Sequence, residues 1–114
     1  MVRDPRSLLW DAQEAADAVM LFTRDRRLDD YIADRMLSAA VERKFEVLGE
    51  ALNKLSKVAP DLAVKIPELR RIVAFRNLLI HGYASVDDVV VWRAAKDELP
   101  KLRKHISELL AGLG

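Results

Sequence analysis

The segment Phe75-Arg76-Asn77-Leu78-Leu79-Ile80-His81-Gly82-Tyr83 carries an arginine, a histidine and a tyrosine with the spacing R-x4-H-x-Y. These polar residues lie within one of the most apolar parts of the chain. Hydrophobic residues recur around them at the steps of one helix face, at Leu69, Ile72, Val73, Leu79 and Ile80. Arg76 falls on the same face, where burying a permanent charge costs free energy unless the guanidinium is paired or binds a ligand. The segment therefore predicts a helix with an unusual charge on its buried face.

Length and composition limit what the chain can be. Its 114 residues, 51% of them hydrophobic, predict a single domain over residues 1–114. The absence of cysteine excludes disulfides and thiolate chemistry, and it favours a reducing cytoplasm. No run approaches the roughly 20 apolar residues of a membrane span, and no secretory signal precedes the first helical pattern. A net charge of +1 is too small to predict a nucleic-acid partner by itself.

Helical periodicity extends from the central segment over the whole chain. Asp4 and Asp34 are suited to cap two of the helices, and Gly82 is suited to end another because glycine tolerates left-handed dihedral angles. Pro100 predicts a kink or break near residues 96–99. The sequence thus predicts an all-α antiparallel bundle of four main helices and a short one, over approximately 5–23, 29–33, 35–58, 67–80 and 89–113.

The longest predicted helix contains two features that bear on Arg76. Its expected buried seam is Leu37, Val41, Lys44, Leu48, Ala51, Leu55 and Val58. Gly49, which costs about 1 kcal/mol within a helix, is expected to permit a close approach by a neighbouring helix or a second subunit. Glu42, Glu46 and Glu50 form an acidic row at four-residue spacing. Either this row is a solvated face, or Glu46 or Glu50 pairs with Arg76 or orients His81.

The spacing of the motif restricts how its side chains cooperate. Each residue of an ideal helix turns about 100°, so Arg76 and Tyr83 share a face. Arg76 and His81 point about 140° apart. For both to act on one group, the helix must end near His81, or two copies of the motif must face each other across a dimer.

The chemistry of these side chains suits metal-independent cleavage of RNA. Arginine fits phosphate oxygens and stays charged, and histidine takes or gives a proton near neutral pH. The 2′-hydroxyl of RNA would attack the adjacent phosphorus, with His81 moving protons and Arg76 stabilising the added negative charge. Asn77 and Tyr83 add neutral hydrogen-bonding groups. No metal cluster is expected, because the other histidine, His105, lies far along a charged stretch.

The same segment resembles the R-x4-H-x-Y signature of the HepT-like toxins, a branch of the HEPN superfamily. Residues 41–51, Val-Glu-Arg-Lys-Phe-Glu-Val-Leu-Gly-Glu-Ala, resemble the family's ER-x-x-E-x-x-GEA segment. Val86-Asp87, Val91-Trp92 and residues 97–100, Asp-Glu-Leu-Pro, resemble its C-terminal helix. The resemblance spans nearly the whole chain in order. It departs from the family at Gly82, a position that is often acidic or polar.

The resemblance implies a HEPN-like helical homodimer in which the motifs of both subunits line one cleft. It implies the toxin of a type VII-like toxin–antitoxin pair, an endoribonuclease with Arg76 and His81 as catalytic residues and Asn77 as a supporting residue. The partner would be an MntA-type nucleotidyltransferase antitoxin that transfers AMP to Tyr83. An adenylate there would add bulk and a negative phosphate close to Arg76.

Two other interpretations remain open from the sequence. One is a non-catalytic helical dimer that binds a nucleotide or a nucleotidyltransferase partner, and the other is a structural dimer in which Arg76 is sealed in an ion pair. Basic side chains either guide RNA or form plain solvated faces; they are Arg24, Arg26, Arg27, Arg70, Arg71, Lys101, Arg103 and Lys104.

Overall fold

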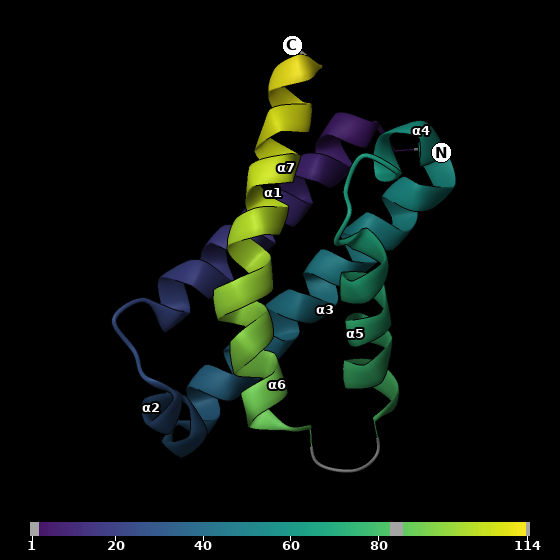
Figure 1. Cartoon of the computed structure of the whole chain (residues 1–114). Coiled ribbons are helices and arrows are strands. Elements are labelled where there is room, and N and C mark those ends of the chain that lie inside the picture. Colours follow the sequence, from purple (N-terminus) through teal and green to yellow (C-terminus); the bar gives the residue numbers. More distant parts are fainter. Residues whose placement is uncertain (1–2, 83–85, 114) are drawn as a thin grey trace.

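The computed structural model describes residues 3–82 and 86–113, which contain only helices and their connections (Figure 1). The predicted all-α bundle is confirmed. Its long helices are α1 (Pro5–Thr23), α3 (Arg35–Val58), α5 (Leu69–His81) and α7 (Leu99–Gly112). Shorter helices lie between them, at α2 (Leu28–Ala33), α4 (Pro60–Ala63) and α6 (Asp88–Arg93). No helix in the described ranges is long and apolar enough to cross a membrane.

Side-chain caps fix the beginnings of the first two long helices. The Asp4 carboxylate accepts a hydrogen bond from the Arg6 backbone N–H at 2.8 Å, and Pro5 occupies the first helical position. The Asp34 carboxylate accepts one from the Leu37 N–H at 3.0 Å. Both caps satisfy N–H groups that have no partner inside the helix. The sequence-based starts of α1 and α3 are therefore confirmed.

The predicted irregularity before Pro100 takes the form of a π-helical turn, η1 (Ala94–Glu98). Pro100 lies in the first turn of α7, where its missing N–H is tolerated best. The wider turn absorbs the disruption without breaking the chain direction. Figure 1 shows α6, η1 and α7 following one another along a single rod that packs beside α1.

The core lies where α3 packs between α1 and α5, and the α6–α7 rod covers α1. Most of the predicted seam of α3 is buried, but Lys44 is only partly buried and Val58 is exposed. In their place, Phe45 and Leu52 are fully buried. Phe45 meets Phe75 of α5 edge to face, with ring centroids 5.0 Å apart. The buried face is thus rotated slightly towards α5, because an aromatic pair adds stability where the two helices meet.

The closest approach between α3 and α5 lies at Gly49, as the sequence predicts. A Cβ atom at this position would overlap the Cβ of Arg76 and lie 2.8 Å from its Cγ and 3.3 Å from the Ile72 carbonyl oxygen. Only glycine leaves room for the stem of Arg76 against α3. Gly49 therefore determines both the helix packing and the position of the arginine.

Substitution of Gly49 tests this packing. Gly49→Ala should lower the free energy of unfolding by about 1–3 kcal/mol, because the methyl group overfills the contact although alanine favours helix by about 1 kcal/mol. Gly112→Ala is the matched control, because nothing lies within 4 Å of a Cβ at that position. Chemical denaturation of both variants measures the difference. Equal stability of Gly49→Ala and the native chain would contradict the close contact.

Candidate functional site

The central motif lies at the end of α5, whose last residue is His81. The N–H of Gly82 donates to the Leu78 carbonyl oxygen at 2.6 Å and closes the last turn. Gly82 has a φ of −77°, so the left-handed conformation expected from the sequence is wrong. Glycine is instead required by space, since a Cβ there would lie 2.5 Å from the Leu78 oxygen. The helix ends at the motif histidine because Gly82 lets the chain turn tightly away.

Arg76 holds a partly buried charge that no carboxylate neutralises within the described ranges. Its stem packs on Gly49, and its Nη1 donates to the Asn77 Oδ1 at 2.9 Å. Its Nε is buried and has no hydrogen-bond partner in the described part of the chain. A guanidinium with unused donors and no counter-ion is suited to bind an anion. The structure therefore does not seal Arg76 in an ion pair within one protomer.

The glutamates of α3 have other partners. Glu46 lies 3.3 Å from the Arg43 guanidinium, and Glu50 lies 3.3 Å from the Lys54 ammonium. The predicted pairing of either glutamate with Arg76 is not formed within the protomer. The reason is the rotation of α3, which turns Gly49 rather than the acidic row towards Arg76. For Glu46 and Glu50 the solvated acidic face is the better description.

His81 and Asn77 are both exposed, and His81 forms no hydrogen bond to Arg76 in the described structure. The helix ends near His81 as the sequence predicts, but His81 is still its last helical residue, so the angle of about 140° between the directions of Arg76 and His81 applies to the folded protein. Both side chains are thus accessible, but they leave the helix on different sides. Tyr83 lies outside the described residues, so its place beside Arg76 stays a prediction.

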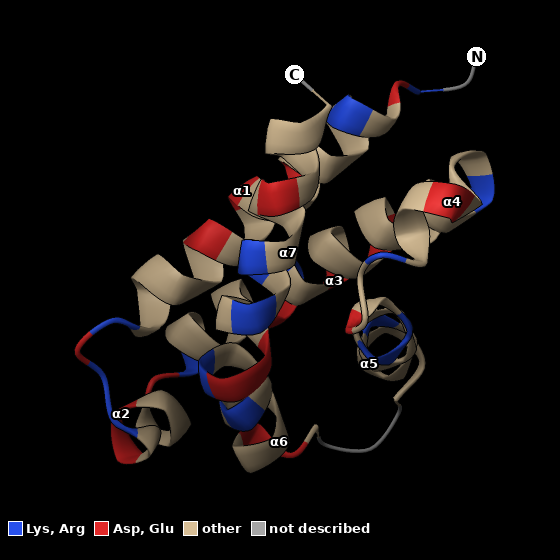
Figure 2. Ribbon diagram, turned by 45° about the horizontal axis from the view of Figure 1, so that its top comes forward, with Lys and Arg blue, Asp and Glu red and all other residues tan. Residues whose placement is uncertain are grey.

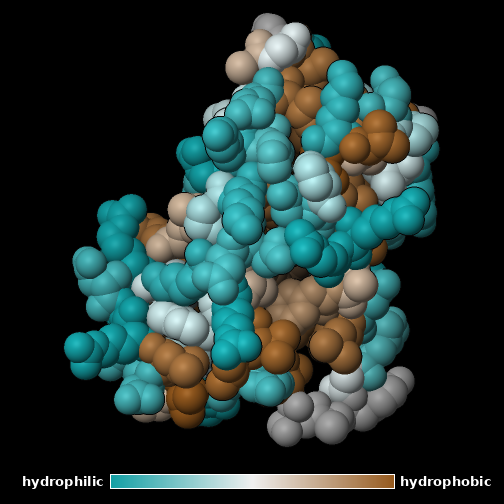
Figure 3. Space-filling model, in the orientation of Figure 1, coloured by the Kyte–Doolittle hydropathy of each residue, from teal (hydrophilic) through white to brown (hydrophobic). Residues whose placement is uncertain are grey.

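The surface around His81 is more apolar than the sequence indicated. Ile80, predicted on the buried face, is 43% exposed, and Leu78 is 55% exposed. Val90 of α6 is exposed as well. Figure 3 shows hydrophobic side chains gathered towards the lower ends of α5 and α6, which Figure 1 places side by side. Large apolar side chains beside a site commonly mark a contact with another molecule.

The second histidine of the chain belongs to the packing of the bundle. The His105 Nδ1 lies 2.9 Å from the Glu68 Oε1, and the Glu68 side chain is only 5% exposed. This contact joins α7 to the residue that precedes α5. Sequence spacing gave no signal for it, because 37 residues separate the two partners. His105 is therefore not part of the candidate site.

Acidic groups gather where α3 meets the start of α6. Burial and the nearby Asp88 carboxylate raise the pKa of Glu42, although the Arg35 guanidinium opposes that rise. Arg35 also pairs with Asp88 at 2.9 Å. Burial likewise raises the pKa of Tyr31, whose hydroxyl has no partner in the described structure. Within residues 3–82 and 86–113, no group of three or more histidine or acidic side chains is arranged to hold a metal ion.

Similarity to known proteins covers almost the whole chain. Residues 12–109 match the family model described as "Ribonuclease HepT-like". A protein of Methanocaldococcus jannaschii named "Putative RNase" is 33% identical over 106 residues, covering 91% of this chain and 94% of the relative. A Thermococcus cleftensis protein named "Probable ribonuclease HepT" is 32% identical over 109 residues, covering 96% of this chain and 98% of the relative. No solved structure gives a significant match.

Proposed function

The chain belongs to the HepT-like ribonuclease family, and we propose that it is the toxin of a prokaryotic toxin–antitoxin pair that cuts RNA internally without a metal ion. Ribonuclease activity is the part of this function that the named relatives support. The cleavage chemistry is proposed from the motif, the dimer from the motif and its surroundings, and the antitoxin from the family resemblance alone.

One observation carries the proposed chemistry: Arg76 is partly buried, and no described carboxylate neutralises its charge. A structural arginine in this environment is usually paired, since burying an unpaired charge is costly. A scissile phosphate would supply the missing counter-ion. Its oxygens would accept hydrogen bonds from the guanidinium, while Asn77 holds Nη1 in place at 2.9 Å.

The proposed reaction uses the 2′-hydroxyl of the RNA as the nucleophile. His81 accepts the proton of that hydroxyl, and a bond forms between the 2′-oxygen and phosphorus. The bond between phosphorus and the 5′-oxygen breaks, and the leaving oxygen takes its proton from the imidazolium. Arg76 stabilises the extra negative charge that develops on the phosphoryl oxygens. DNA would not be cut, because it lacks the attacking hydroxyl.

The directions of the two side chains favour a homodimer as the active form. Within one protomer, Arg76 and His81 point about 140° apart on a continuous helix. Two copies that meet at the end of α5 through the exposed Leu78 and Val90 would bring the arginine of one subunit close to the histidine of the other. Burial of these apolar side chains would stabilise the pair. Glu46 keeps its proposed supporting role only if this assembly brings it to the site.

We further propose that an MntA-type nucleotidyltransferase antitoxin silences the toxin by transferring AMP to Tyr83. Tyr83 comes two positions after the last residue of α5 in the sequence, and the family resemblance implies that the motif tyrosine is the acceptor. The added phosphate would compete for Arg76, and the adenosine would block the approach of RNA. A cytoplasmic location, where RNA and such a partner meet, also stays a prediction.

The competing function is a non-catalytic helical dimer that binds a nucleotide or a nucleotidyltransferase partner. This function also accounts for the unpaired Arg76, as a binding residue, but it does not need His81 to transfer protons. The third interpretation, a structural dimer with Arg76 in an ion pair, needs a partner that the described part of one protomer does not supply.

Loss of either motif residue should abolish the reaction. We expect His81→Ala to lower the rate of RNA cleavage by about a hundredfold or more, and Arg76→Gln to do the same through lost charge stabilisation. His105→Gln should cleave at the native rate, because His105 contacts Glu68 rather than the site. Purified variants are compared on single-stranded RNA between pH 6 and 9. Full cleavage by His81→Ala would contradict the proposed role of His81, whereas native protein that leaves RNA intact at every pH from 6 to 9 would leave the non-catalytic dimer as the function.

Mixing the two inactive variants tests whether the site is shared between subunits. A heterodimer of Arg76→Gln and His81→Ala contains one pair of intact residues on opposite subunits. Random mixing should therefore restore about a quarter of native cleavage if each native dimer holds two such pairs. Mixing either variant with itself is the control. If no activity returns although exchange of subunits is verified, the two residues act from the same chain.

The modification site is tested with the two tyrosines of the chain. Tyr83→Phe should escape AMP transfer by the nucleotidyltransferase and ATP, so its cleavage activity should not fall during the incubation. Tyr31→Phe should still be modified, because Tyr31 is fully buried in the native chain. Intact-mass measurement detects the added AMP. Modification of Tyr83→Phe to the native extent would exclude Tyr83 as the acceptor.

A further inference from the structure

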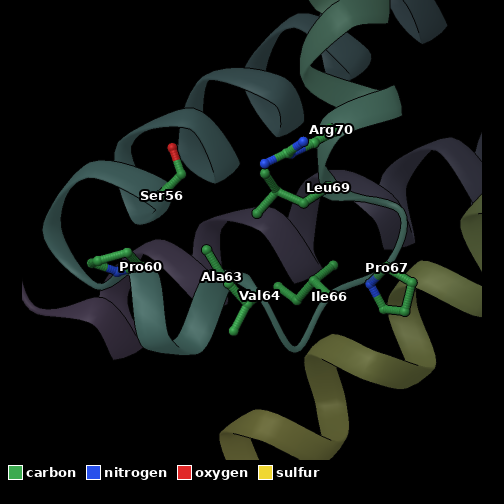
Figure 4. A pocket seen from close by; sticks show the side chains of 8 residues that line it. All are labelled: Ser56, Pro60, Ala63, Val64, Ile66, Pro67, Leu69 and Arg70. Carbon is green, nitrogen blue, oxygen red and sulfur yellow. The ribbon is translucent and has the colours of Figure 1, made fainter.

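A groove runs between α3 and α5 from the motif towards α4. Its hollow of about 400 Å³ begins at Asn77, the hydrogen-bond partner of Arg76. The residues that define this α3–α5 groove are Asn53, Ser56, Arg70, Val73, Ala74 and Asn77. It continues into a second hollow of about 420 Å³ through Ser56, Leu69 and Arg70. Figure 4 shows the second hollow, where Ser56 of α3 faces Leu69 and Arg70 across the space above α4.

The charge of the groove suits an anionic ligand. Neither hollow is lined by aspartate or glutamate. By contrast, the hollow on the other side of α5, towards α6, includes Asp97 and Glu98. Arg70 is exposed and forms no ion pair within the described ranges. Its neighbour Arg71 faces the other hollow and pairs with Glu98 at 3.2 Å. One of the two adjacent arginines is thus available to bind phosphate.

The spacing of the polar groups suits a nucleotide. Arg70 and Asn77 are seven residues apart on α5, so they share a face and lie about 10 Å apart along its axis. Between them, Val73 and Ala74 form an apolar strip of the wall. Across the groove, the Asn53 carbonyl oxygen accepts from the Ser56 hydroxyl at 2.6 Å, and the Asn53 side-chain amide has no partner in the described structure. An amide offers both a donor and an acceptor to the edge of a base.

We propose that the α3–α5 groove binds the RNA nucleotide next to the cleaved phosphodiester, with Arg70 on its phosphate and Asn53 on its base. The inference rests on the proposed ribonuclease function and makes the groove its substrate subsite. Arg76 takes the scissile phosphate, Asn77 marks the point where the strand enters the groove, and Arg70 holds the following phosphate. The apolar strip lies against the sugar or base.

The test compares two neighbouring arginines in the full-length protein. Binding of a fluorescent 2′-O-methyl RNA oligonucleotide, which has no free 2′-hydroxyl to attack, is measured by anisotropy over a salt series. Arg70→Gln should weaken binding about fivefold near 0.1 M salt and reduce the slope of log K against log salt by about 0.7, the value for one phosphate contact on a single strand. Arg71→Gln removes the same charge one residue away and should leave the affinity within twofold of the native protein and the slope unchanged.

A second variant probes the base rather than the phosphate. Asn53→Asp keeps the shape of the side chain but removes its donor and adds a negative charge to the groove. We expect weaker binding and a change in the bases that flank the cuts in a long single-stranded RNA, read by sequencing the fragments. A loss of fold stability alone would leave the cutting pattern unchanged.

The outcomes separate this inference from the proposed function. If the native protein cleaves RNA but Arg70→Gln and Arg71→Gln bind it equally well, the subsite is wrong and the ribonuclease stands. If Arg70→Gln and Asn53→Asp change the sedimentation of the protein instead of its affinity for RNA, the groove is an interface between copies of the chain, and the proposal is overturned. If RNA binds as described but is never cut, the subsite stands and the ribonuclease fails.

Discussion

The contact between Gly49 and Arg76 is the constraint on which the arrangement of the site depends. A helix that presents only hydrogen at this point lets the stem of an arginine lie against its backbone. The stem is thereby held between α3 and α5, while the guanidinium remains partly accessible and bonded to Asn77. Any larger residue at position 49 would push α5 away and move the charge with it. The same contact therefore determines how α5 packs on α3 and where the charge of Arg76 lies.

The same contact explains why the acidic row of α3 does not neutralise Arg76. Turning Gly49 towards α5 turns Glu46 and Glu50 to the flank, where each pairs with a basic residue of its own helix. Such exposed pairs contribute little to stability. Their main consequence is that neither glutamate pairs with Arg76. The guanidinium is left with a buried Nε that has no partner in the described structure. A partly buried guanidinium that is held in place by a glycine contact and lacks a counter-ion in the described structure is suited to bind an anionic ligand.

The end of α5 near His81 is less covered by other helices than its beginning. Figure 1 shows α3 diverging from α5 towards its lower end, so the helix loses cover as it approaches His81. Figure 2, in which α5 is seen along its axis, shows basic residues on that helix. Apolar side chains at this end and the carboxylate-free groove along the other half of α5 would serve two different partners. One is suited to another protein surface, and the other is suited to a strand of nucleic acid.

Much of the fold could be predicted from the sequence, because local rules determine helices. The caps at Asp4 and Asp34 and the irregularity before Pro100 depend only on neighbouring backbone groups. The need for glycine at position 49 was also visible, since glycine within a helix requires a reason. The residues of the motif were identified by their spacing, although their roles stay predictions.

Tertiary structure decided the neighbours of each side chain. The sequence could not show that Phe45 and Leu52 replace Lys44 and Val58 in the core, because the buried face depends on the rotation of α3 against α5. It predicted Ile80 as buried, whereas the divergence of the helices leaves it exposed. It also could not distinguish Arg70 from Arg71, which differ only in the groove that each one faces. Periodicity specifies which residues share a face of a helix, but only the packing of one helix on another specifies what that face meets.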